Sequence, residues 1–268
     1  MTEDRRIAEG LLDSLIANGL VLDRDREHAV TVLSSFGKVA TMSYVEHYSL
    51  EDEKGELKFV CGTQFSKLER DMQFDDELRW HLLNALFSIR VLFQNQANSY
   101  IVEYLTEQPD YSGVFSGIGM DFSVGSDVNK MSLESLFHDY VYFFPETVRE
   151  QIAAEYALGP EAFASYMQAF CFAYSLAERG RKLVDIRFFE KLPPLPIESG
   201  ASLKWNYHRT MVGNIVLLYD HFVRMQEHEE DAWLEKEVRD PLHRYSIRPE
   251  RIGFYDEPLD EWPVTIQE

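Results

Sequence analysis

The feature that most constrains the fold is a long stretch of helical periodicity between residues 76 and 106. Apolar residues recur there at spacings of three and four, which places their side chains on one face of a helix. These residues are Leu78, Leu82, Leu83, Leu86, Ile89, Leu92, Phe93, Ile101 and Leu105. A stripe of this length has to be buried, so the chain must supply several other elements that pack against one long helix.

Several shorter stretches show the same periodicity, and glycine or proline punctuates them. Gly180 is expected to interrupt one of them, and the last should stop before Pro241, because proline cannot continue a helix. Two helices near the N-terminus should form a hairpin that ends at Gly37. The predicted helices cover residues 2–19, 23–37, 133–144, 146–157, 161–191 and 203–239.

Between the N-terminal helices and the long one, the pattern changes to that of strands. Residues 39–48 and 56–65 are rich in β-branched and aromatic side chains and flank a polar turn. Ser66 and Glu69 then fit a capping box at the start of the next helix. Together these patterns predict a mainly α, α-rich α+β fold: a helical bundle of about seven to nine helices with one small β-hairpin.

A glycine-rich acidic stretch divides the helical patterns into two groups. Residues 111–131 contain four glycines and break the periodicity. The organisation predicted from this is a first part over residues 1–110 and a helical second part over residues 132–268, or else one continuous domain. The polar tail after Pro241 is expected to lie extended over the surface, and its sequence does not decide whether it is ordered.

The charge balance is the most unusual feature of the composition, since 46 Asp and Glu against 26 Lys and Arg give a net charge of −20. A surface of this kind repels nucleic acid and anionic membranes, because both are bound through cations. Basic protein surfaces are then the expected partners, with simple solubility as the alternative role of the charge. The one basic island, residues 179–191, would dock an acidic patch of the same protein or of a second copy.

Cysteine usage and hydropathy predict a cytoplasmic protein. Cys61 and Cys171 lie far apart in apolar runs, which favours two buried thiols over a disulfide framework or a metal site. No apolar signal-peptide core follows Met1. The longest apolar stretch, residues 211–219, is too short to cross a bilayer.

Four residues offer the least weak signal for catalysis. On helical patterns, His81 is followed by the pair His138-Asp139 and later by Asp220. This order resembles the ligand set of HD-type metal phosphohydrolases, which are all-helical, and the resemblance implies a divalent metal with a metal-activated water that attacks a phosphoester. A chain of this composition contains roughly 0.5 His-Asp pairs by chance, and the aromatic flanks of His138 indicate a buried helix as the alternative.

The sequence therefore favours a non-enzymatic, acidic protein-binding module that needs no cofactor or metal. One concrete version is an inhibitor that mimics nucleic acid and occupies the basic nucleic-acid-binding surface of a partner, as anti-defence and immunity proteins do. The alternatives are the metal-dependent phosphohydrolase and a structural subunit of an obligate complex, with self-association possible in principle. The carboxylates predicted to contact the partner are Glu51, Asp52, Glu53, Asp110, Asp121, Asp127, Glu227, Glu229, Glu230 and Asp231.

Overall fold

The chain is mainly α-helical in the computed structural model, which describes residues 3–52, 56–108, 131–180, 182–185, 212–224 and 233–253. Within these ranges it forms eight α-helices and a single two-stranded antiparallel sheet. The predicted mainly α fold with one small β-hairpin is therefore confirmed. The apolar core consists of two clusters, and the longest helix contributes to both of them.

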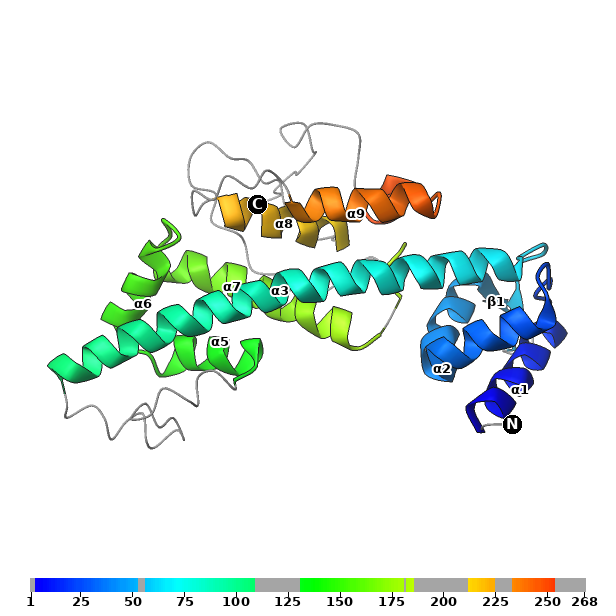
Figure 1. The fold of residues 1–268 in the computed structure, drawn as a ribbon, viewed down its shortest axis with the longest axis horizontal. Coiled ribbons are helices and arrows are strands. Elements are labelled where there is room, and N and C mark those ends of the chain that lie inside the picture. Colours follow the sequence, from blue (N-terminus) through cyan, green and yellow to red (C-terminus); the bar gives the residue numbers. More distant parts are fainter. Residues whose placement is uncertain are drawn as a thin grey trace.

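Helix α3, Phe65–Glu107, is the axis of the molecule and runs along its length (Figure 1). It begins well before residue 76, where the sequence pattern predicted its start. The reason is that buried apolar residues at helical spacing continue upstream, at Phe65, Leu68 and Met72. A helix of this length gives the other elements a common surface to pack on.

The start of α3 is held by side chains from elsewhere in the chain, and the predicted capping box is wrong. The N-cap residue Gln64 makes no side-chain hydrogen bond to the helix end. The backbone N–H and the hydroxyl of Ser66 both donate to Asp23. Glu69, the expected partner of Ser66, is hydrogen-bonded to the His28 ring at 2.7 Å instead. Tertiary contacts thus replace the local cap at this helix end.

The N-terminal helices α1, Glu3–Ala17, and α2, Arg26–Tyr48, pack on each other beside the start of α3. The prediction of a strand over residues 39–48 is wrong, because α2 continues through them after a kink at Gly37. Burial at helical spacing outweighs the strand preference of the side chains in this stretch. The buried residues are Thr41, Tyr44, Val45 and Tyr48.

The predicted β-hairpin is present but short. Strand β1, Ser49–Glu51, pairs antiparallel with β2, Leu57–Phe59. The backbone N–H of Phe59 also donates to the carbonyl of Asn18 at 2.9 Å, just after α1. Since an isolated two-stranded sheet is marginal in water, this contact with the helical layer helps to hold the hairpin in place.

From Phe74 onward, α3 shares a core with five further helices, and this core is rich in aromatic rings. The rings of Tyr156 and Phe222, for example, stack with their centroids 4.6 Å apart. The helix that ends at Glu178 is followed by Gly180, which has a left-handed φ of +63°. The predicted break at Gly180 is therefore confirmed. The five helices are α5, Leu133–Tyr142; α6, Glu146–Ala154; α7, Pro160–Glu178; α8, Val212–Arg224; and α9, Trp233–Arg244.

Helix α9 does not stop before its proline. It passes through Pro241 and ends at Arg244, which contradicts the predicted boundary. Proline near the end of a helix removes only one N–H donor there, and burial of Pro241 and Leu242 offsets that loss. Residues 225–232, which the sequence placed inside one long helix with α8 and α9, lie outside the described ranges.

The start of the C-terminal tail packs against the body of the protein. Ile247 is buried and Ile252 is fully buried, and the short 3-10 helix η4, Pro249–Arg251, lies between them. The expectation of a tail extended over the surface is therefore wrong as far as Gly253. The sequence missed this because the apolar residues that anchor the segment, among them Leu242, Ile247 and Ile252, show no helical or strand periodicity.

The two core clusters meet within α3. Met72 belongs to the cluster formed with α1 and α2, whereas Phe74 belongs to the cluster formed with the later helices. The predicted division at residues 111–131 falls almost wholly outside the described ranges. None of the described helices has an apolar stretch long enough to cross a membrane.

We predict opposite effects for two glycine-to-alanine changes. A Cβ added at Gly37 would meet nothing within 4 Å, but its φ of +77° is left-handed. Gly37→Ala should therefore lower the free energy of unfolding by about 1 kcal/mol or more. A Cβ added at Gly10 in α1 would also meet nothing within 4 Å, and Gly10 has a helical φ. Gly10→Ala should therefore raise the free energy of unfolding by about 0.5–1 kcal/mol. Urea unfolding followed by circular dichroism measures both, and effects of the same sign would contradict the assignment of the kink.

Candidate functional site

Asp220, one of the four predicted catalytic residues, serves as a cap for a helix. Its buried carboxylate accepts the backbone N–H groups of Leu234 at 3.0 Å and Glu235 at 2.8 Å. These are N–H groups of the first turn of α9, which have no acceptor within their own helix. Asp220 therefore joins α8 to α9, and both of its oxygens are occupied.

The two predicted histidines lie on different helices and face different partners. The His81 ring on α3 is buried, and its Nδ1 lies 3.8 Å from Glu237 of α9. The His138 ring on α5 is exposed, and its Nδ1 lies 3.2 Å from the neighbouring Asp139. In the part of the chain that the structure describes, no group of three or more possible metal ligands comes together. The ligand set implied by the phosphohydrolase resemblance is thus not assembled there.

Only two of the carboxylates predicted to contact a partner lie within the described ranges. Glu51 is exposed at the end of β1, whereas Asp52 closes the hairpin turn by accepting the backbone N–H of Glu56 at 2.9 Å. The others lie outside the described residues: Glu53, Asp110, Asp121, Asp127, Glu227, Glu229, Glu230 and Asp231.

The structure adds an acidic surface that the sequence analysis did not single out. Residues 91–108 and 131–178 contain a single Lys or Arg, which is Arg149. Over the same ranges they contain nine carboxylates: Glu103, Glu107, Glu134, Asp139, Glu146, Glu150, Glu155, Glu161 and Glu178. These carboxylates do not stand out as a cluster in the linear sequence, because they are spaced along four helices.

The last turns of α3 and helix α6 lie side by side (Figure 1). Tyr100 of α3 donates a hydrogen bond to Glu155, just after α6. This bond, partial burial and the charges of Glu155 and Glu103 raise the pKa of Tyr100 to about 12. We call this region the acidic end, and its exposed carboxylates are Glu103, Glu107, Glu146, Glu150 and Glu155.

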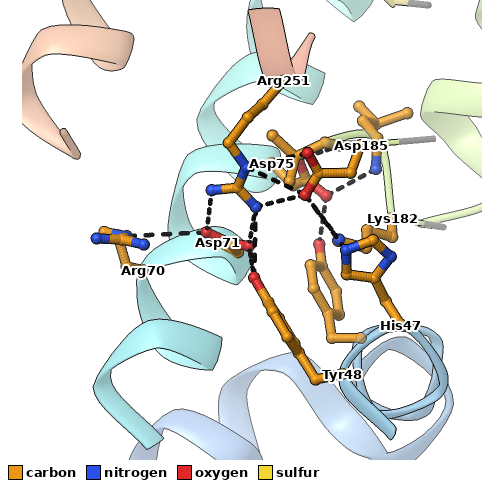
Figure 2. Close-up of polar contacts among 11 residues, drawn as sticks. His47, Tyr48, Arg70, Asp71, Asp75, Lys182, Asp185 and Arg251 are labelled. Carbon is orange, nitrogen blue, oxygen red and sulfur yellow. Dashed lines mark hydrogen bonds and ion pairs between the residues drawn. The ribbon is translucent and has the colours of Figure 1, made fainter. Parts of the chain in front are cut away.

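A second polar feature is a buried network where the two core clusters meet, shown in Figure 2. Its centre is Arg251 of η4. The guanidinium donates to Asp71 of α3 at 2.6 and 3.1 Å, to Asp185 at 2.5 and 3.0 Å, and to the Tyr48 hydroxyl of α2 at 3.3 Å. One arginine thus connects four segments that are far apart in the sequence. We call this network the clasp.

Asp75, one turn after Asp71, is fully buried, as Asp71 is. It accepts the Tyr44 hydroxyl at 2.8 Å and the backbone N–H groups of Leu183 and Val184 at 2.7 and 3.0 Å. Burial raises the pKa of Asp75 to about 6, although the three hydrogen bonds and nearby Lys182 act in the opposite direction. The carboxylate therefore fixes the segment after α7 against α2 and α3.

Lys182 and Asp185 complete the clasp. The Lys182 ammonium is buried 3.5 Å from Asp185, and burial lowers its pKa to about 8 against the opposing effect of the three carboxylates. Although burial alone would raise it, hydrogen bonds from His47 and Arg251 hold the pKa of Asp185 well below its usual range. Lys182 belongs to the predicted basic island, and it lies against carboxylates of its own chain.

The arrangement of these groups determines what each region can do. The clasp holds its charges in pairs inside the protein, which suits a structural joint. The acidic end holds carboxylates in water, which suits contact with a basic surface. Comparison with protein-family models, with curated proteins and with solved structures gave no match.

We predict that Asp75→Asn lowers the free energy of unfolding at pH 7 by about 2–4 kcal/mol, because an amide cannot accept all three hydrogen bonds. The neighbouring Asp76 is exposed and pairs with Arg79 at 3.5 Å. Asp76→Asn, the matched control, should cost about 0.5 kcal/mol or less. Urea unfolding measures both changes, and equal costs would contradict the role given to Asp75.

The same variant has a pH dependence with a definite sign. The folded pKa of Asp75, about 6, lies above its ordinary value of 3.8, so the folded state binds the proton more tightly. The contribution of Asp75 to stability therefore grows as the pH falls from about 7 to about 4.5. The deficit of Asp75→Asn relative to wild type should increase by about 2 kcal/mol over that range. A deficit that stays constant or shrinks would contradict this.

Proposed function

We propose that this protein is a binding protein whose acidic surface docks on a basic surface of another protein. The support comes from the net charge of −20 and from the way the charge is distributed. Opposite charges steer two proteins together and favour partners of the matching sign. Association should therefore be fast at low salt and weak at high salt.

The single observation that carries this proposal is the acidic part of the described structure, residues 91–108 and 131–178. Nine carboxylates there are accompanied by one arginine. Five of the eight exposed ones belong to the acidic end, where α6 lies beside the last turns of α3. A surface used only for solubility gains little from concentrating like charges, which repel one another. A partner rich in Lys and Arg would relieve that repulsion.

The more specific form of the proposal is an inhibitor that occupies the nucleic-acid-binding surface of its partner. Carboxylates would then stand where phosphates normally lie, and lysine and arginine side chains of the partner would pair with them. Anti-defence and immunity proteins act in this way as classes. Glu51, which was also predicted to contact a partner, lies on β1 at the opposite end of α3 from the acidic end (Figure 1), so the proposed contact rests on the acidic end alone.

We predict that capture of partners depends on the acidic end. Tagged protein is incubated with native-host lysate at low and high salt, and bound proteins are identified by mass spectrometry. A basic, nucleic-acid-handling protein should be captured at low salt and lost at high salt. The variant Glu103→Lys/Glu107→Lys/Glu150→Lys should lose it, because it reverses the charge of the acidic end.

A matched variant controls for the change in total charge. Glu3 and Asp4 on α1 and Glu46 on α2 are exposed and far along the sequence from the acidic end. Glu3→Lys/Asp4→Lys/Glu46→Lys changes the net charge by the same amount and should keep the partner. Equal loss in both variants, or no salt-sensitive partner at all, would overturn the proposal.

A further inference from the structure

Two adjoining pockets lie where the start of α2, the start of α3 and the end of α9 meet. Their volumes are about 690 and 640 Å³, and both are lined by Gln73 and Tyr245. Pockets of a few hundred Å³ are the usual size for small-molecule ligands. Neither pocket contains the clasp or the acidic end, so the proposal made above does not account for them.

The first pocket is lined by three arginines in a chain of strongly negative charge: Arg24, Arg70 and Arg244. The Arg24 guanidinium lies 4.0 Å from Glu69 and that of Arg70 lies 3.8 Å from Asp71, both too far for a hydrogen bond. Within the described part of the chain, the buried Nε of Arg70 has no hydrogen-bond acceptor. The Arg70 side chain as a whole is 37% exposed. Guanidinium groups that line a pocket suit a phosphate group, whose oxygens they can bind in pairs.

The carboxylates of this pocket are already engaged by the protein. Glu69 is hydrogen-bonded to His28 at 2.7 Å and to the Gln73 amide at 3.1 Å. Asp25 accepts the backbone N–H groups of Glu27 and His28 as the N-cap of α2. Since these acids have partners of their own, they leave Arg24 and Arg70 available to an anionic ligand.

The second pocket is aromatic. Phe36, Trp80 and Tyr245 line it, and the Trp80 side chain is 61% exposed although it is the largest apolar group nearby. An exposed indole ring can stack on a flat heterocycle. Asp76 and Glu77 lie in the same pocket, where Asp76 pairs with Arg79 at 3.5 Å and Glu77 accepts a hydrogen bond from Arg244 at 2.6 Å.

We propose that the two pockets together bind a nucleotide. Its phosphates lie against Arg24 and Arg70, whereas Arg244 stays paired with Glu77. Its base stacks on Trp80, with the sugar crossing near Tyr245. The lining of the pockets gives this orientation, because Arg24 and Arg70 line only the first pocket and Trp80 lines only the second, whereas Tyr245 lines both. The site is independent of the docking function proposed above.

The test is isothermal titration calorimetry with three probes: ADP, adenosine and inorganic pyrophosphate, in the presence of EDTA. ADP should bind saturably and at least about tenfold more tightly than either fragment, because only ADP fills both pockets. Arg70→Gln should weaken ADP and pyrophosphate about tenfold or more. Trp80→Ala should weaken ADP about tenfold and leave pyrophosphate unchanged.

Arg6→Gln on the exposed face of α1 is the control, because it removes one positive charge away from the pockets. Its affinity for ADP should equal that of wild type. Thermal unfolding verifies that each variant is folded. The proposal is overturned if ADP does not bind saturably, if pyrophosphate binds as tightly as ADP, or if Arg70→Gln and Arg6→Gln behave alike. None of these results bears on partner capture, so the two proposals can fail separately.

Discussion

The contact of Arg251 with Asp71 and Asp185 is the interaction on which the arrangement of the two core clusters depends. The clusters meet on α3 between Met72 and Phe74, and the clasp lies at that junction. Its energetics differ from those of a surface ion pair. Taking such charges out of water is costly, but removing one partner leaves the others buried without compensation. The clasp therefore acts less as a source of stability than as a constraint on which segments pack together.

Much of the fold could be predicted because helix formation leaves a periodic trace in the sequence. The buried stripe of α3 and the breaks at Gly37 and Gly180 are of this kind. The strand predicted over residues 39–48 was wrong because β-branched and aromatic residues favour strands in isolation. In the structure, the helical spacing of the buried side chains in this stretch determined the helix. Packing that depends on distant parts of the chain overrides local preference, and a single sequence carries little trace of it.

The candidate sites were harder to predict for the same reason. Asp71 and Asp75 lie before residue 76, where the long helix was predicted to start, and their partners lie far along the chain. Asp71 pairs with Arg251, and Asp75 accepts the backbone N–H groups of Leu183 and Val184. Lys182 was recognised as basic, but the sequence could not tell whether it met its own chain or another. Conversely, Asp220 was predicted as a metal ligand, because the sequence does not distinguish an aspartate that caps a helix from one that binds a metal. In the structure, Asp220 caps α9. Its role depends on which atoms surround it.

Native-state hydrogen exchange of Arg251→Leu tests the central claim, that the clasp couples the two clusters. In the wild type, amides of α2 and α7 should exchange through a common opening. In the variant, α2 should exchange faster by about a hundredfold or more, while α7 in the larger cluster changes little. Arg244→Leu, which removes an exposed ion pair with Glu77, should affect neither helix. Unchanged exchange of α2 in Arg251→Leu, or an equal increase in both helices, would contradict the account.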